Sequence, residues 1–279
     1  MDKVVSWREG RIESNSNPER ISGKNAGMAV RFKTEKDEKV MLKVAISYVS
    51  VEQARKNMLT ELSGWDFEQV KQSSFSEWND WLGRIEVEGG SREQQIKLYT
   101  DLWHALLGRH VVSDADGHYM DMTSDFPRIR QIPLGEDGKP LYNHHNFDAW
   151  WGSHWSLNIL WSMAYPEVMD NFCNTMTDMY QNGGLIPRGP SGGNYTYVMI
   201  GDPAVSFFAS AYNKGICNYD AELAYEGLRK NAFVGGIRDH AGYEHSKTAH
   251  SGGMKYYEER GYVPDGRKDV KGCILPELP

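Results

Sequence analysis

The sequence predicts a chain of mixed α and β structure, in which a short β-rich segment precedes a series of paired helices. Three observations predict this fold class. Residues 28–46 alternate apolar and polar side chains, as strands do. From residue 50 onward, the apolar residues recur with the 3.6-residue period of helices. Proline and glycine then stand at positions where helices typically begin and end.

The predicted strands lie within the first fifty residues. Met28, Val30 and Phe32 face one way, and the alternation resumes over 40–46 after the charged turn 35–38. We therefore expect a β-hairpin. Because two strands alone are marginally stable in water, this hairpin should belong to a larger sheet.

Two capping boxes open the first helices. Ser50 is followed three residues later by Gln53, and Ser91 by Gln94. In a capping box, the serine side chain accepts from the backbone N–H of the glutamine, and the glutamine side chain accepts from the backbone N–H of the serine. Between these two helices, residues 67–85 carry a further helical pattern.

Proline and glycine delimit the later helices. Pro166 and Pro203 stand where a first helical residue is expected, and Gly183 and Gly215 where a helix should stop. The helices are expected over 153–164, 166–181, 203–214 and 220–231, whereas 235–272 should contain little regular structure. Paired helices build either an α/α toroid or a solenoid, and the lack of a motif repeated at a fixed period favours the toroid.

Composition excludes several classes of function. The formal net charge is −7, so the chain lacks the basic character of a nucleic-acid-binding protein. No apolar run is long enough to span a membrane, and Met1 precedes a charged stretch rather than a signal peptide. Cys173, Cys217 and Cys273 match no zinc spacing and no disulfide framework. Residues 114–117 resemble half a calcium loop, but the pattern is more typical of a turn.

Several segments, taken in order, resemble glycoside hydrolase family 92. Residues 46–57 are similar to the strand-to-helix junction that leaves the family's N-terminal domain, and 78–85 to the linker helix that follows. Residues 184–188 (Gly-Leu-Ile-Pro-Arg), 199–202 (Met-Ile-Gly-Asp) and 211–216 resemble the segment that borders the sugar pocket. The resemblance extends over about residues 25–265.

The resemblance implies a β-sandwich packed on an (α/α)6 barrel. On that basis, residues 1–50 would be the last strands of an incomplete sandwich, 51–90 a helical linker, and 91–279 the first part of the barrel. Members of the family are calcium-dependent exo-α-mannosidases that invert the anomeric configuration. Inversion requires a carboxylic acid at the leaving oxygen and a carboxylate that activates water.

The family's acid lies in a Glu-Gly-Asn motif and its base in a Gly-Asn-Asp/Glu-Asp motif, and neither motif occurs in these 279 residues. We therefore assign no catalytic residue and no metal ligand in this chain, and we expect it to be inactive alone. Calcium is expected for the full-length family member, with its ligands mostly outside this chain.

The resemblance places part of the sugar pocket at Phe147–Trp151. The family carries Trp-Asp-Thr-aromatic-Arg there, so that Asp148 matches the aspartate and Trp150 the aromatic residue. Phe147 replaces the leading tryptophan and Trp151 the arginine, which indicates a divergent branch. Asp148 would accept hydrogen bonds from sugar hydroxyls; read without the resemblance, it could equally be a helix cap or a solvated loop residue.

Two further residues are candidate substrate contacts. Arg188 could clamp a hydroxyl-rich or anionic ligand, or be a surface charge. Asp202 precedes Pro203 and is first interpreted as a helix N-cap, with a sugar contact as its second role.

Other ligand-type residues have more ordinary interpretations. His144, His145 and His154 are poor metal ligands, because adjacent histidines point apart and no carboxylate completes a site. Of Trp150, Trp151, Trp155 and Trp161, most should lie in the core and one or two could stack on a sugar.

The sequence thus predicts part of an exo-α-mannosidase that acts on mannose-containing glycans of the N-glycan type. The alternative is a non-catalytic glycan-binding or helical scaffold protein that kept the pocket wall and lost the chemistry. Neither interpretation involves nucleic acid or a membrane span, and both leave the oligomeric state open. The full-length family member is expected to be periplasmic or secreted.

Overall fold

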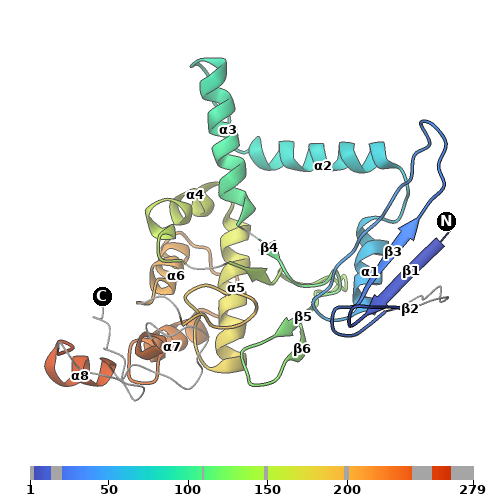
Figure 1. Ribbon diagram of the computed structural model, residues 1–279. Helices are drawn as coiled ribbons and strands as arrows, with labels where there is room; N and C mark the ends of the chain where they lie inside the picture. The colour runs from blue at the N-terminus through green and yellow to red at the C-terminus, as the bar shows by residue number, and fades with distance from the viewer. Residues whose placement is uncertain are drawn as a thin grey trace. The chain divides into compact units, whose positions relative to one another are not determined.

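The computed structural model describes residues 3–13, 21–108, 110–147, 150–197, 201–240 and 253–264. The chain divides into two compact units, Met1–Lys43 and Val44–Pro279, which are described separately. It is of mixed helix and strand structure, as the sequence predicts (Figure 1).

The first unit contains a three-stranded antiparallel sheet. The strands β1 (Lys3–Arg8), β2 (Arg11–Glu13) and β3 (Gly27–Arg31) lie in the order β2-β1-β3. Glu9 and Gly10 link β1 to β2 with φ of 50° and 76°. Positive φ at both residues is typical of the type I′ turn, whose twist matches that of the flanking strands.

The predicted hairpin between 28–32 and 40–46 is wrong. Val30 pairs with Val4 and Met28 with Ser6, so the partner of β3 is the first strand of the chain. Residues 40–46 form no strand, and the side chain of Leu42 is 84% exposed. Alternation shows which residues suit a strand, but the partner depends on which backbone comes within hydrogen-bonding distance, and for β3 that backbone is β1.

The second unit is mainly helical. Its helices are α1 (Val51–Glu61), α2 (Phe67–Leu82), α3 (Arg92–Leu107), α4 (Leu157–Ala164), α5 (Pro166–Gly183), α6 (Ala204–Asn213), α7 (Ala221–Asn231) and α8 (Gly253–Arg260), with short 3₁₀ turns η1 (Ser153–Trp155) and η2 (Ile237–His240). Two small antiparallel pairs accompany them: β4 (His110–Val111) with β7 (His145–Asn146), and β5 (His118–Asp121) with β6 (Arg128–Gln131).

Most helix limits agree with the predicted signals. Ser50 and Ser91 cap α1 and α3, and the Ser91 box is complete in both directions. Gly184, one residue after the predicted stop at Gly183, ends α5 with φ of 88°, a conformation that glycine adopts without strain. Asp202 is not the N-cap of α6, because Pro203 occupies that position and no side chain caps the helix. The expected irregularity of 235–272 is also wrong in part, since η2 and α8 lie within it.

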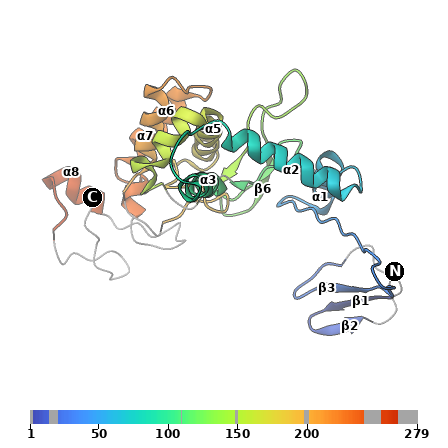
Figure 2. The ribbon, with the colours of Figure 1, turned by 90° about the horizontal axis from the view of Figure 1, so that it is seen from above.

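The core of this unit surrounds α5, which α4, α6 and α7 contact (Figures 1 and 2). Phe172 of α5 is wholly buried; its ring stacks parallel to that of Trp161 at 5.6 Å and meets Trp150 edge-on at 4.7 Å. In an incomplete toroid, helices that lack neighbours should leave rows of apolar side chains exposed. The sequence predicts one such row on α5, formed by Val168, Met169, Phe172 and Met176. That expectation is wrong for α5, where all four are at most 2% exposed. On α6, by contrast, Tyr212 is 61% exposed.

Within the described residues, no helix is both long and apolar enough to cross a membrane.

Candidate functional site

Three segments that are distant in sequence meet at the predicted pocket wall. The Phe147 amide donates to the Pro190 carbonyl at 3.4 Å, and the Trp150 amide donates to the Arg188 carbonyl at 2.9 Å. The Arg188 side chain in turn reaches the carbonyl of Gly201, the residue before Asp202. The structure therefore brings Trp150, Arg188 and Asp202 together. Asp148 lies outside the described residues, although Phe147 and Trp150 on either side of it are both held to the loop.

Arg188 holds this loop from inside. Its guanidinium is fully buried and donates to three backbone carbonyls: Gly201 at 2.8 Å, Thr196 at 3.3 Å and Ile237 at 2.6 Å. Burial lowers the pKa of Arg188 to about 10, so the side chain stays charged at neutral pH. The interpretation of Arg188 as a surface charge is wrong, and the described geometry gives it the role of fixing loop backbone.

Trp150 is part of the aromatic core. Its ring is fully buried, stacks on Phe147 at 4.4 Å, and its indole nitrogen lies 3.2 Å from the sulfur of Met176. A ring with no exposed face can shape a pocket but cannot stack on a sugar without rearrangement. Of the four clustered tryptophans, Trp151 and Trp155 are exposed, at 67% and 77%, and these two present surface for contact.

Asp202 is a buried carboxylate close to two arginines, Arg188 and Arg238. It is 8% exposed, and neither carboxylate oxygen makes a hydrogen bond of ordinary geometry within the described residues. Burial raises the pKa of Asp202 to about 6, an effect that the charges of Arg238 and Arg188 and weak hydrogen bonds from the Asn231 side chain and the Ala204 amide partly offset. A buried carboxyl is costly even when it is partly compensated, and carboxyls whose pKa is shifted by burial are concentrated at functional sites.

The adjacent histidines point to different neighbours, as expected. His144 stacks on Tyr119 at 4.0 Å, whereas His145 packs against Phe172 at 4.7 Å. His154 is exposed on η1. Among the described residues, no group of three or more His, Cys, Asp or Glu side chains could hold a metal ion.

A polar pocket that the sequence did not indicate lies between the β5–β6 hairpin and the end of α5. Its volume is about 430 Å³, and Tyr119, Tyr142 and Asp178 line it. The Tyr142 hydroxyl donates to Asp178 at 2.7 Å. The one available signal was a carboxylate on the most buried helix, with Thr177 and Met179 buried on either side of it.

Residues 53–273 match the family model of the glycosyl hydrolase family 92 catalytic domain. The chain belongs to glycosyl hydrolase family 92. The match covers most of the helical unit, including both sides of the loop that Arg188 holds.

Relatives of known structure or curated description agree with family 92. An uncharacterized secreted glycosidase of Arthroderma benhamiae is 25% identical over 252 residues, which are 88% of this chain and 26% of that protein. A family GH92 inverting mannosidase from Bacteroides thetaiotaomicron has the same fold, with a TM-score of 0.70 at 22% identity over 94% of this chain and 33% of its own.

A second solved structure is a family GH92 alpha-mannosidase from the same organism in complex with mannoimidazole. It matches with a TM-score of 0.71 at 21% identity, over 96% of this chain and 33% of its own. The chain thus spans about a third of the length of these structures and about a quarter of the curated relative.

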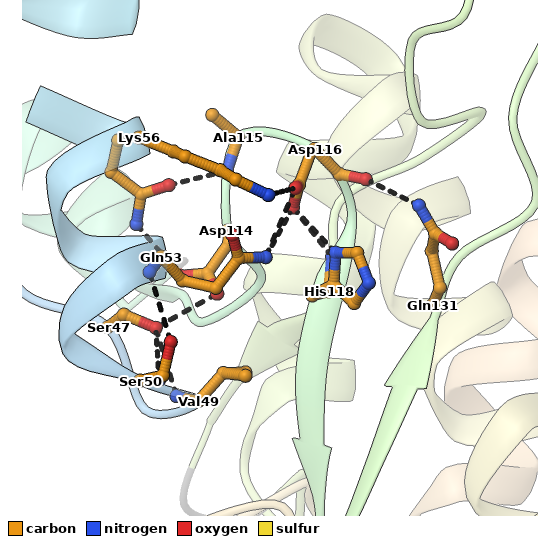
Figure 3. A network of polar contacts seen from close by, with 11 residues as sticks. Ser47, Val49, Ser50, Gln53, Lys56, Asp114, Ala115, Asp116, His118 and Gln131 are labelled. Carbon is orange, nitrogen blue, oxygen red and sulfur yellow. Dashed lines mark hydrogen bonds and ion pairs between the residues drawn. The ribbon is translucent and has the colours of Figure 1, made fainter. Parts of the chain in front are cut away.

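Family 92 implies a bound calcium ion, and residues 114–117 resemble half a calcium-binding loop. The contacts of this turn show whether its carboxylates could bind the ion. Protein donors already occupy its carboxylates: Ser47 donates to Asp114 at 2.9 Å and Gln53 to Asp116 at 2.8 Å (Figure 3). Asn57 donates to the other oxygen of Asp114 at 2.8 Å. The His118 ring nitrogen lies 2.8 Å from the same Asp116 oxygen. The turn therefore does not fit a calcium site, and it serves instead as an acceptor for the residues at and before α1.

Asp116 shows how strongly these donors act. Burial tends to raise the pKa of Asp116, but hydrogen bonds from His118, Gln53 and Lys56 outweigh it and hold that pKa well below its usual range. The carboxylate thus remains ionised at neutral pH, as its ion pair with Lys56 at 3.2 Å requires.

Proposed function

We propose that this chain is the sugar-recognising part of a family 92 exo-α-mannosidase that acts on mannose-containing glycans of the N-glycan type. The observation that carries the proposal is the family match over 53–273, which contains the segment around Asp148 and the loop around Arg188. The likeness in fold to a mannosidase bound to mannoimidazole supports mannose as the sugar.

The proposal includes the finer features of the family. The helices of the second unit would be part of an (α/α)6 barrel, and the first unit would contribute strands to a β-sandwich, with domains at 1–50, 51–90 and 91–279. Hydrolysis would be calcium-dependent and would invert the anomeric centre. The secreted relative supports export to the periplasm or the medium.

Within this function, each residue has a distinct part. Asp148 would accept hydrogen bonds from sugar hydroxyls, and Arg188 fixes the loop to which the Trp150 amide is bonded. Asp202, with its pKa raised to about 6 by burial, is either a donor or an acceptor according to pH. Trp150 supports the wall from behind. The acid and the base of the reaction are assigned to no residue of this chain, because neither motif occurs in it.

Two measurements on the purified chain test the proposal. Calorimetric titration with mannoimidazole should detect binding that Asp148→Ala weakens and that Asp80→Ala, at an exposed carboxylate of α2, leaves unchanged. Equal affinity of the Asp148 variant would contradict the assignment.

Hydrolysis of an aryl α-mannoside supplies the second test. The chain should release no product above a mock preparation, with or without calcium, since general acid–base catalysis is worth about 10²–10⁴-fold per group. Calcium-dependent turnover would show that the acid and base lie within these residues. A third measurement uses this chain joined to the remaining length of a family 92 relative. If that fusion binds mannoimidazole but hydrolyses no mannoside, the alternative of a non-catalytic glycan-binding scaffold is favoured.

A further inference from the structure

We propose that the pocket between the β5–β6 hairpin and the last turns of α5 is a second carbohydrate site, which binds one neutral hexose unit of a glycan. It shares no lining residue with the Trp150–Arg188–Asp202 wall. The choice of a hexose rests on the proposed function, whereas the neutral, hydroxyl-rich character of the ligand follows from the pocket itself.

The pocket has the size and the rigid base of a ligand site. Its volume of about 430 Å³ lies within the range of about 300–1,000 Å³ typical of small-molecule sites. Tyr119 forms the base, where its ring stacks on the buried His144 at 4.0 Å. The Tyr119 hydroxyl accepts a hydrogen bond from Asn182 of α5 at 3.1 Å, which ties the hairpin to the helix. The pocket is therefore built before a ligand arrives.

The charges of the pocket select a neutral ligand. Of its lining residues, Asp178 and Arg130 alone are charged, and they are of opposite sign. An anion would meet the carboxylate and a cation the guanidinium. The buried His144, whose Nε2 lies 4.0 Å from the nearer Asp178 oxygen, has its pKa lowered to about 3 by burial and adds no charge at neutral pH.

The remaining polar groups suit hydroxyls, which both donate and accept. Gln131, Gln181 and Asn182 line the pocket with carboxamides, each of which has a carbonyl acceptor and two N–H donors. The Asp178 carboxylate accepts one hydrogen bond from Tyr142, at 2.7 Å, and has lone pairs left for a ligand. A pair of adjacent sugar hydroxyls can donate to the carboxylate while it stays bonded to Tyr142.

The state of Asp178 gives the site a dependence on pH. Burial raises its pKa to about 6; the bond from Tyr142 lowers the pKa and the charge of Asp121 on β5 raises it further. The other groups that face it are Tyr119 of β5, Arg130 of β6 and the neutral His144. A ligand held by the ionised carboxylate should therefore bind more weakly below pH 6 than above it.

Titration of the chain with methyl α-D-mannopyranoside, followed by saturation-transfer NMR and calorimetry, tests the proposal. We expect Asp178→Asn to weaken binding at this site at least tenfold at pH 7.5 while thermal stability is kept or raised. The matched control is Asp170→Asn, which removes the same charge from another carboxylate of α5 that does not line the pocket. Its affinity should equal that of the parent chain.

The variants separate this proposal from the proposed function. Loss of binding in Asp148→Ala alone, with Asp178→Asn unchanged, overturns the second site and supports the first. Loss in Asp178→Asn alone supports the second site and overturns the first. Binding of inorganic phosphate in place of the mannoside, lost in Arg130→Ala, would show that the pocket is an anion site and would overturn the hexose assignment. Absence of mannoside binding in the parent chain overturns both.

Discussion

Helices α2 and α5 have similar lengths and clear apolar faces, yet they lie in opposite environments. Nine of the residues of α5 are buried, whereas α2 has no buried residue. Up to Phe75, α2 exposes its apolar side chains, with Phe67 at 66%, Val70 at 41% and Phe75 at 67%. Only toward its C-terminus does α2 pack, where Trp81 stacks on Tyr165 at 5.6 Å.

The difference teaches what an apolar period can predict. The period identifies the face of a helix that would be buried, but it does not say what covers that face. In α5 the cover comes from α4, α6 and α7. The same reasoning from sequence therefore gives a correct helix in both cases but a wrong environment for α5, whose apolar row was expected to be uncovered.

The largest expected effect comes from truncating one phenylalanine in each helix. Phe172→Ala should reduce the free energy of unfolding by about 3–5 kcal/mol, because it leaves a cavity among Trp150, Trp161 and Phe207. Phe75→Ala on α2 should cost less than about 0.5 kcal/mol. Denaturant unfolding of both variants measures the contrast. Equal losses would mean that α2 is as closely packed as α5.

A smaller effect should appear in the dependence of stability on pH. The pKa of Asp178 is about 6 in the folded chain against an ordinary 3.8, so its charge is penalised only when folded. The penalty is absent below about pH 4 and complete above about pH 6. Asp178→Asn should therefore stabilise the chain by about 2–3 kcal/mol at pH 7.5 and by nothing near pH 4.

Thermal unfolding of Asp178→Asn at both pH values measures this difference. The control is Asp101→Asn on α3, whose carboxylate is mostly exposed and should show no such contrast. A gain that is the same at both pH values would mean that burial does not raise the pKa of Asp178.

The smallest effect should be local to α2. Asp66 caps this helix by accepting from the Gln69 amide at 2.9 Å. Because little packing holds the first turns of α2, Asp66→Ala should speed hydrogen exchange there by an amount that corresponds to about 1 kcal/mol. Glu77→Ala, on an exposed site of the same helix, is the control. Unchanged exchange in the Asp66 variant would indicate that packing, and not the cap, sets the stability of that end.

The parts of the fold that follow from local chemistry were predictable. Ser50, Ser91 and Asp220 cap helices and Gly184 ends one, because each signal acts on backbone groups within a few residues of itself. The family and the gathering of Phe147 and Trp150 with the Arg188 loop also followed from short motifs. Whether the four predicted site residues contact sugar stays a prediction.

The parts that depend on distant partners were not predictable. Met28 and Val30 have the same alternation whether they pair with β1 or with 40–46. From the sequence, Arg188 could be a surface charge. In the structure it is buried and donates to the carbonyl of Ile237, 49 residues later in the chain. From the sequence, Asp178 is one polar residue of an amphipathic helix. Only the structure shows that the β5–β6 hairpin brings Tyr119 to the same pocket.

The bonds between α1 and the 114–118 turn also close a loop of chain. Gln53 and Asp116 are 63 residues apart, and α2 and α3 lie within the segment between them. The entropy lost on closing such a loop rises by only about 0.6 kcal/mol for each doubling of its length. Insertions between α2 and α3, at residues 84–90, should therefore be tolerated as long as Gln53 and Asp116 keep their bond.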